Sequence, residues 1–431
     1  MSEKTININI PVLARVEGEG ALDLRIANNE IEHLRLRIFE PPRFFEKLLE
    51  AKHYSDVPDI VARICGICPV AYQMSAVSAF ESLFALDPGE WVHRMRRLFY
   101  CGEWIESHAL HIHLLAAPDF LGFENAADMS LHFPEQVKRG LRLQHAGNQI
   151  LQFLGGRAVH PVGVKVGGFF HAPNLVQAKQ LLGALQACLD DAQDLLVWLL
   201  SLDLPGEASD FTQVALKSEH SYDFIGRHLH TNLGFDCSIE DFATHFKETH
   251  ETHSTALYSL LNSSDYLVGP LARLNLNHHL LPQPVKQLIQ TYGFQLPNQN
   301  MFNSIIARGI ELYFALAEAI NILQNYEHTQ YPSVNVKVKA GQAFGCSEAP
   351  RGILWHSYEI DDDGYVRHAR IVPPTSQNQA RMQADLQQGL TQFGLDRPEN
   401  ELRLHAEQII RNYDPCISCA THFLNLNLAR V

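Results

Sequence analysis

Charged residues are scarce in this sequence. Only 19% of its 431 residues are Asp, Glu, Lys or Arg, and 46% are apolar. Globular proteins carry about 25% charged residues, so this chain is expected to commit much of its length to a buried core rather than to disorder. Basic residues are the scarcer kind, because 34 Lys and Arg stand against 48 Asp and Glu, for a net charge of −14. This acidic balance argues against nucleic acid as a general partner.

Long apolar runs, signal sequences and linkers are also lacking. No stretch reaches the 18 or so apolar residues that a membrane span requires, and the run around 195–202 ends at Asp203. The first ten residues lack the charged-then-apolar layout of a secretory signal. Eight Cys are too few for a disulfide scaffold, and no repeat or Pro/Gly/Ser linker marks a domain boundary. We therefore expect a cytoplasmic protein with one domain over residues 1–431 and no membrane span.

The spacing of apolar residues predicts a mainly α fold (α+β). Alternation predicts three strands around 6–10, 22–26 and 34–38, with a turn at 28–29, and further strands at 334–338 and 353–360. Helical spacing predicts long helices over about 91–115, 134–155, 175–196 and 305–323, and others over 379–395 and 400–412. We predict a mostly β part over residues 1–60, a helical core over 61–422 around a central long-helix bundle, and small peripheral β-sheets.

Two Cys-x-x-Cys pairs are the main chemical signal. Cys65 and Cys68 form one pair, Cys416 and Cys419 the other, and 348 residues separate Cys68 from Cys416. A zinc ribbon places its pairs roughly 15–20 residues apart, and a thioredoxin-like pair requires a βαβ unit, so neither fits. If both pairs bind one metal, the site joins two distant parts of the chain. Four thiolates suit nickel, zinc or an iron–sulfur centre.

Both pairs lie beside predicted helix starts. Asp414–Pro415 is typical of an N-cap followed by a first-turn Pro, which places the second pair in the first turn of a helix. Pro69 begins a predicted helix directly after the first pair. Helix N-termini lower thiol pKa values and so favour metal-binding thiolates. The other thiols have no such spacing and are interpreted as core or incidental residues: Cys101, Cys188, Cys237 and Cys346.

The motifs around these pairs resemble those of the large subunit of nickel–iron hydrogenases. Seven segments are similar to family motifs and occur in family order: Arg15-Val-Glu17-Gly, Arg43-Phe-Phe-Glu46, Arg63-Ile-Cys-Gly-Ile-Cys68, Gly155-Gly-Arg-Ala-Val-His-Pro161, Glu348-Ala-Pro-Arg-Gly352, Val372-Pro-Pro-Thr-Ser-Gln-Asn378 and Asp414-Pro-Cys-Ile-Ser-Cys-Ala-Thr-His422. Together they span residues 15 to 422. The resemblance implies the hydrogenase large-subunit fold and a catalytic subunit that cleaves H2 reversibly into protons and electrons.

The resemblance also implies a ligand set. Cys65 and Cys416 would bind nickel terminally, and Cys68 and Cys419 would bridge nickel to an iron that carries cyanide and carbon monoxide. A metal centre polarises H2 while a nearby base takes the proton. Glu46 and His422 resemble the ligands of a second ion, magnesium or iron.

Five further residues resemble functional positions of the family. Arg351, held by Pro350, resembles the basic group above the metals that can receive the proton and that hydrogen-bonds a cyanide. Thr375 resembles the partner of the other cyanide. Glu17 resembles the first proton relay. Taken alone, Arg351 is more typical of a surface ion pair, Thr375 of a turn hydroxyl and Glu17 of a solvated carboxylate. Asp119 and Asp414 resemble carboxylates that surround the site.

Departures from the family pattern indicate a branch. Tyr72 and Glu19 stand where many members have His. The chain looks most like the soluble cytoplasmic enzymes linked to NAD(P). Residues 423–431 resemble the tail that an endopeptidase removes after nickel insertion, so we expect the mature subunit to end at His422. Other histidines on a helical pattern are interpreted as partly buried, hydrogen-bonded imidazoles, among them His108, His111 and His113.

The implied partners follow from the electron balance. Since no further Cys cluster is present for a relay, electrons would leave through an iron–sulfur small subunit and then through flavin-containing, NAD(P)-reducing subunits. Nickel-insertion factors and the maturation endopeptidase are further implied partners. Three alternatives stay open at this stage: a regulatory hydrogen sensor, a non-hydrogenase electron-transfer relative such as the quinone-site subunit of respiratory complex I, and a structural zinc protein. The four intact Cys argue against the second.

Overall fold

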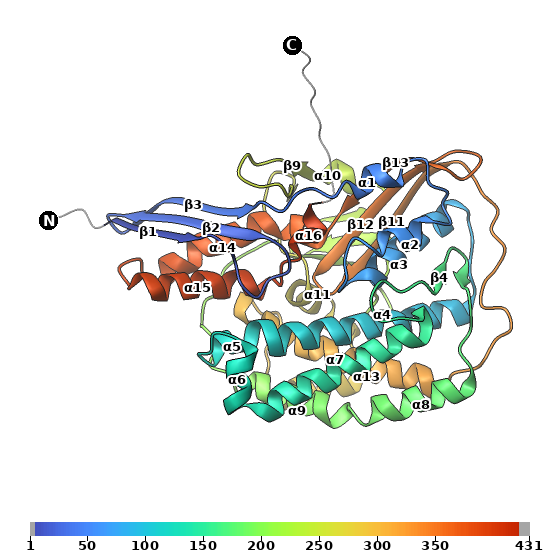
Figure 1. Ribbon diagram of the computed structural model, residues 1–431, viewed down its shortest axis with the longest axis horizontal. Helices are drawn as coiled ribbons and strands as arrows, with labels where there is room; N and C mark the ends of the chain where they lie inside the picture. Colours follow the sequence, from blue (N-terminus) through green and yellow to red (C-terminus); the bar gives the residue numbers. More distant parts are fainter. Residues whose placement is uncertain (1–4, 422–431) are drawn as a thin grey trace, which may run out of the picture.

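Long helices form the lower layer of the molecule in the view of Figure 1, a computed structural model that describes residues 5–421. Three of them pack side by side: α4 (Glu90–Leu110), α7 (Pro134–Gly155) and α13 (Ser304–Gln324). Pro134 begins α7 and Gly156, at φ 76°, ends it, because proline suits a first turn and glycine tolerates the left-handed conformation. The predicted helical bundle is confirmed.

One predicted helix is two. The segment expected over 175–196 forms α8 (Leu175–Gln186) and α9 (Leu189–Leu200), with a turn at 187–188. The apolar spacing continues across the break, but Asp190 and Asp191 occupy the first turn of α9, where carboxylates stabilise a helix start. α4, in contrast, continues through a π-helical turn, η1 (His111–Ala116), into α5 (Ala117–Phe120).

An antiparallel sheet extends to the upper left of Figure 1. It comprises β1 (Thr5–Ile10), β2 (Gly20–Ala27) and β3 (Glu30–Ile38), in that order, as the alternation predicts. Ile8 pairs with Leu24 and Ile10 with Leu22, and all four side chains are buried.

A second sheet is buried rather than peripheral. β11 (Gly341–Ala349), β12 (Gly352–Ile360) and β13 (Val366–Val372) form an antiparallel sheet on which α3 (Pro69–Leu83) packs. The packing is close, because a Cβ atom on Gly345 would lie only 1.9 Å from the backbone oxygen of Ser75. This sheet and α3 carry two of the segments that build the site described below.

The remaining helices and strands complete the fold. The other helices are α1 (Phe45–Leu49), α2 (Val57–Val61), α6 (Ala126–His132), α10 (Phe242–His245), α11 (Pro270–Asn277), η2 (His278–Leu280), α12 (Gln283–Thr291), η3 (Met301–Asn303), α14 (Pro374–Phe393), α15 (Glu399–Asn412) and α16 (Ile417–Ala420). The other strands are β4 (Val164–Lys165), β5 (Gly168–Phe169), β6 (Val214–Leu216), β7 (His228–Thr231), β8 (Asp236–Ser238), β9 (Phe246–Thr249) and β10 (Tyr258–Leu261).

The strand predicted at 334–338 is wrong. Residues 334–338 are irregular, and the isolated bridge to Gly168 is made by Ser333, the residue before them. Val336 and Val338 still pack against the core, so the alternation reports their partial burial and not a partner strand.

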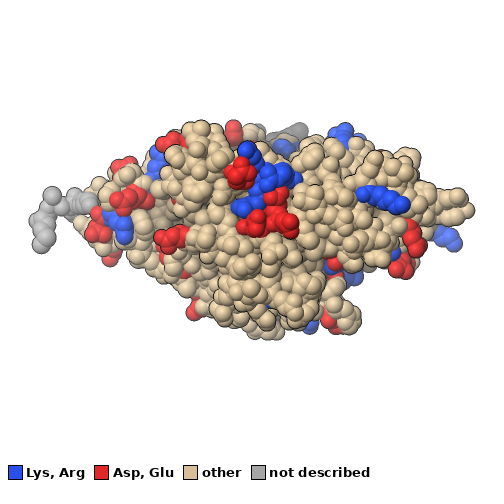
Figure 2. Space-filling view, turned by 90° about the horizontal axis from the view of Figure 1, so that it is seen from below, with Lys and Arg blue, Asp and Glu red and all other residues tan. Residues whose placement is uncertain are grey.

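One face of the molecule carries few charged side chains. Figure 2 shows one face on which charged side chains are sparse, apart from a mixed group of basic and acidic residues near its centre. Within residues 5–421, no helix combines the length and the apolar character needed to cross a bilayer.

Candidate metal centre

The two Cys-x-x-Cys pairs meet in the interior. The Sγ atoms of Cys65 and Cys416 lie 3.6 Å apart, and those of Cys68 and Cys419 lie 3.9 Å apart. The Sγ atoms of Cys65, Cys68 and Cys419 all lie within 4.8 Å of one another, as a shared metal ion requires. No side chain of the four is more than 4% exposed. The prediction that both pairs build one site is therefore consistent with the geometry.

The first pair lies in the loop between α2 and α3. Cys68 is the N-cap of α3, which begins at Pro69 as predicted. The backbone N–H groups of Ile67 and Cys68 donate to Cys65 Sγ, at 3.3 and 3.2 Å. Hydrogen bonds from the other thiols, Cys416 first, lower the pKa of Cys65 well below its ordinary value. This loop therefore favours a thiolate at Cys65.

The second pair lies at the start of α16, but not as predicted. Cys416 itself is the N-cap, and Asp414, at φ 51°, lies outside the helix. The carboxylate of Asp414 is instead bonded to the Arg351 guanidinium, with 3.1 Å between Oδ1 and Nη2. The predicted helix cap at Asp414 is thus wrong, because a buried ion pair takes the carboxylate that local sequence would assign to capping.

Glu17 lies against the second pair. Its Oε2 is 3.1 Å from Cys416 Sγ and accepts a hydrogen bond from the Ser418 backbone N–H at 3.0 Å. Its backbone oxygen accepts from the Ile417 N–H at 2.9 Å. Glu17 is only half-buried. A carboxylate in this position can exchange a proton with a thiol and with the outside of the site.

Arg351 stands at the tip of a two-residue turn. Pro350 and Arg351 connect β11 to β12, and the pairing of Ala349 with Gly352 closes the hairpin. Arg351 is 3% exposed, and its Nε donates to the Asp414 backbone oxygen at 2.7 Å. Nη1 of Arg351 has no hydrogen-bond partner among residues 5–421. A buried guanidinium with a spare donor indicates an acceptor that the polypeptide does not supply.

Thr375 and Arg43 tie the second pair to the rest of the fold. Thr375, in the first turn of α14, accepts a hydrogen bond from the Cys416 N–H at 3.0 Å. Nη2 of Arg43 donates to the backbone oxygens of Ile64, at 2.7 Å, and of Ser418. Arg43 therefore joins the segments that carry the two pairs. The Arg43 motif was recognised in the sequence, but this bridging role was not predicted.

Asp119 lies in a separate buried ion cluster. It is bonded to Arg15 and to Arg411, whose Nη1 is 2.9 and 3.0 Å from the two carboxylate oxygens. None of its side-chain hydrogen bonds within residues 5–421 reaches a cysteine. Its connection to the site is through Arg411, three residues before Asp414 on the same chain segment.

Glu46 lies at a second position, in α1. Its Oε1 accepts a hydrogen bond from the Ile371 backbone N–H of β13 at 2.7 Å, and burial raises its pKa to about 7. His422 lies outside the described residues. The Arg43 N–H donates to the Thr421 backbone oxygen at 2.7 Å, so the residue before His422 lies beside the start of α1.

The sequence analysis missed the buried charges that support the site. Arg273, Glu311 and Glu348 form a cluster in which no residue is more than 1% exposed. A signal was present, since Glu311 and Arg308 interrupt an otherwise strongly apolar stretch of helix at 304–324. Charged residues in such a helix indicate buried pairs.

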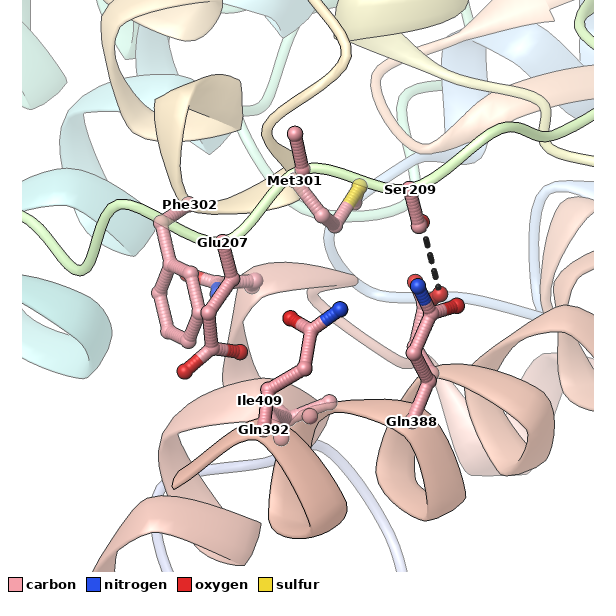
Figure 3. Close-up of a pocket in the computed structure, with 11 residues that line it drawn as sticks. Glu207, Ser209, Met301, Phe302, Gln388, Gln392 and Ile409 are labelled. Carbon is pink, nitrogen blue, oxygen red and sulfur yellow. Dashed lines mark hydrogen bonds between the residues drawn. The ribbon is translucent and has the colours of Figure 1, made fainter. Parts of the chain in front are cut away.

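A small cavity elsewhere does not compete for this role. It has about 30 Å³, room for about two waters, between the loop at 207–209, η3 and helices α14 and α15 (Figure 3). Ser209 bonds to Asp385 across it at 3.4 Å, and no thiol lines it.

Comparison with known proteins identifies the family. The family model described as nickel-dependent hydrogenase matches residues 43–139 and 236–422. The chain is 31% identical to sulfhydrogenase 2 subunit alpha of Pyrococcus furiosus, over 97% of this chain and all of that one. It is 25% identical to the NAD-reducing hydrogenase HoxS subunit beta of Cupriavidus necator, over 98% and 96% of the two chains.

A solved structure shares the fold. An NAD+-reducing NiFe hydrogenase in the H2-reduced state superposes with a TM-score of 0.87 at 23% identity, over 97% of this chain and 99% of that chain. Both curated relatives are named as subunits of hydrogenases. The chain belongs to the nickel-dependent hydrogenase family, whose large-subunit fold it has, and it is an oxidoreductase subunit of that family.

Proposed function

We propose that this chain is the catalytic subunit in which a nickel–iron centre cleaves H2 reversibly into two protons and two electrons. The observation that carries the proposal is the meeting of four buried thiols with one half-buried carboxylate, Glu17. A structural zinc site has four ligands of this kind but no use for a carboxylate within hydrogen-bond distance of a ligand sulfur.

The ligand roles proposed follow the family pattern. Cys65 and Cys416 would hold nickel terminally, and Cys68 and Cys419 would bridge to iron with cyanide and carbon monoxide ligands. The donor set fits, because soft thiolates select such metals. The spare Nη1 donor of Arg351 fits a metal-bound cyanide, which accepts hydrogen bonds.

The chemistry is divided between the centre and the polypeptide. When bound, the centre supplies a Lewis acid that polarises H2, which has no dipole of its own. Cys416 Sγ and Glu17 Oε2 lie 3.1 Å apart, so a proton on this sulfur can pass directly to the carboxylate. The N–H of Ser418 holds that oxygen in place, and the partial exposure of Glu17 gives the proton a way out.

The buried side of the centre would be lined by four residues: Pro350, Arg351, Thr375 and Asp414. Arg351 and Asp414 are each at most 4% exposed, so they act in a dry environment where a charge-assisted hydrogen bond is strong. We assign Asp119 a supporting role through Arg411. Glu46 and His422 are proposed ligands of a separate magnesium or iron ion.

The electrons require a partner. Among residues 5–421, only one group of metal-type side chains is close enough to hold an ion, and it is the cysteine site itself. We therefore infer an iron–sulfur small subunit and flavin-containing subunits that reduce NAD(P). Two of the similar proteins are named NAD-reducing hydrogenases.

The proposal extends to the domain organisation, the location and the maturation of the protein. We infer one domain over residues 1–431, a cytoplasmic location, nickel-insertion factors, and an endopeptidase that removes residues 423–431.

One experiment tests the central proposal. The complex is purified, nickel and iron are measured by elemental analysis, and the infrared spectrum is searched for cyanide and carbon monoxide stretches. We expect one nickel and at least one iron per chain, together with both kinds of band. A properly matured complex with intact Cys residues that contains zinc in place of nickel, or lacks the bands, contradicts the proposal.

A further inference from the structure

A buried arginine outside the cysteine site uses every donor it has. Arg273, in α11, is 1% exposed. Its guanidinium makes five hydrogen bonds, to Glu311 at 2.9 and 2.8 Å, to Glu348 at 3.1 Å, and to the backbone oxygens of Ala349 at 2.7 Å and Pro350 at 3.1 Å. A guanidinium has five N–H groups, so none is left over.

Two of these bonds hold the turn that carries Arg351. The oxygens of Ala349 and Pro350 belong to the two residues directly before Arg351. The turn also touches the start of α11 backbone to backbone, because a Cβ on Gly269, at φ 117°, would lie 2.8 Å from the Arg351 oxygen. Only glycine permits this approach, so α11 and the turn are fitted to each other.

The other side of the cluster fixes Arg273. The Trp104 ring centre lies 4.4 Å from the guanidinium carbon, and the Tyr222 hydroxyl donates to Glu311 at 2.8 Å. Burial opposes the ionisation of Glu311, but Arg273 outweighs it and lowers the pKa of Glu311 to about 2. His108 Nε2 lies 3.0 Å from the same carboxylate. The counterion of Arg273 therefore remains charged at ordinary pH.

We propose that Arg273 is a positioning residue for Arg351: by binding both carbonyls of the turn, it fixes where the Arg351 guanidinium stands beside Asp414. This inference rests on the proposed function, in which Arg351 stands on the buried side of the metal centre and donates to a metal-bound cyanide. A lysine at position 273 keeps the charge, but it offers three donors from one point and cannot reproduce the planar fork. Displacement of a catalytic group by about 1 Å can cost about 100-fold in rate.

The test uses the complete complex with Arg273→Lys. Hydrogen exchange, followed by mass spectrometry, reports the amides of residues 348–353 without reference to activity. We expect exchange there to rise by about 10-fold and H2 turnover to fall by about 10-fold or more, at unchanged nickel content. Tyr222→Phe is the matched control, because it removes a hydrogen bond from the same cluster but leaves both turn carbonyls bonded. We expect this control to keep turnover and exchange near those of the unchanged protein.

A double-mutant cycle separates positioning from general damage. If Arg273 acts through Arg351, Arg273→Lys has little further effect on turnover in an Arg351→Lys background. Independent, multiplying effects would overturn the proposal, as would unchanged exchange in residues 348–353. If Arg351→Lys alone leaves turnover intact, the proposed role of Arg351 fails, and the exchange measurement alone then decides whether Arg273 holds the turn.

A second variant covers the case in which Arg273→Lys does not fold. Glu348→Gln keeps the side-chain shape and an acceptor for the Leu216 N–H, which bonds Oε1 at 2.8 Å, but weakens the ion pair with Arg273. We expect a smaller rise in exchange with a smaller loss of turnover. A folded Glu348→Gln complex with both quantities unchanged would contradict the proposal.

Discussion

Glu17 and Cys416 face each other across the site, although 399 residues separate them in the chain. Their backbones form an isolated parallel bridge, and the Glu17 carboxylate lies 3.1 Å from the Cys416 sulfur. A backbone pairing thus sets the distance between this carboxylate and this thiol of the candidate site. The position of the base does not depend on a flexible side chain alone.

Replacing Glu17 by Gln tests its role as a proton acceptor. The amide oxygen can still accept from the Ser418 N–H, but the side chain cannot carry a proton away. General acid–base groups contribute about 100-fold to 10,000-fold, so we expect H2 turnover to fall by at least about 100-fold while nickel content is kept. Glu19→Gln, two residues away and exposed, is the control and should retain turnover. Full activity in Glu17→Gln would remove the proposed relay.

Replacing Cys65 by Ser tests the ligand set. A hydroxyl is a poor ligand for a soft metal, and the buried pocket offers no substitute thiol. We expect loss of nickel by elemental analysis and of detectable H2 uptake. Cys188→Ser, a half-buried thiol at the start of α9, should keep both. Full uptake by the Cys65 variant would be incompatible with the proposed centre.

Replacing Arg43 by Lys tests the bond between the two segments of the site. Lysine cannot span the oxygens of Ile64 and Ser418 with the same planar geometry. A hydrogen bond from a charged group contributes about 1.5–3 kcal/mol, so we expect a lower thermal midpoint and several-fold less retained nickel. Arg142→Lys, which alters an exposed pair with Asp191, should change neither quantity. Equal behaviour of the two variants would show that Arg43 is not a link.

Acid should destabilise the protein through its buried histidines. Burial lowers the pKa of His113 to about 3, whereas the unfolded chain titrates near 6.5. Between these values the unfolded state binds more protons, so stability is lost as pH falls below about 6.5, by about 2 kcal/mol at pH 5. We expect His113→Phe to narrow the gap between thermal midpoints at pH 7 and pH 5. The exposed His171→Phe should leave that gap unchanged.

Intact-mass measurement tests the proposed tail. Active, nickel-loaded subunit should end at His422, whereas the Cys65→Ser chain, which cannot load the centre, should retain residues 423–431. A full-length, nickel-loaded and active subunit would show that removal of these residues is not part of maturation.

Sequence patterns predicted the helices well where one face of a long helix is apolar throughout. The predicted ranges of α4, α7 and α13 differ from the observed ranges by only a few residues, because a 3.6-residue period is a strong signal over about twenty residues. The same reasoning predicted α8 and α9 as one helix, because apolar spacing alone does not reveal a two-residue turn between them. It also assigned a strand to 334–338, where the alternation reflects partial burial and the backbone is irregular.

The site was only partly predictable for a similar reason. Four thiols could be grouped from their spacing and from the family resemblance. The role of Asp414 could not be predicted from its neighbours in the sequence, because its carboxylate is bonded to Arg351, 63 residues away in the chain. The contacts of Arg273 with the turn before Arg351 are likewise visible only once the topology is known, since they join residues 76 and 77 positions apart. Spacing indicates which residues can share a face, and long-range contacts determine how each is used.

The distance along the chain between Cys65 and Cys416 has a consequence for the order of events in biosynthesis. After the first thiol pair leaves the ribosome, more than three hundred further residues must be made before the second pair exists. Throughout that interval only two of the four thiols of the site exist, and any soft ion could occupy them. The complete set of four is therefore available only to a cofactor delivered after the second pair has been made.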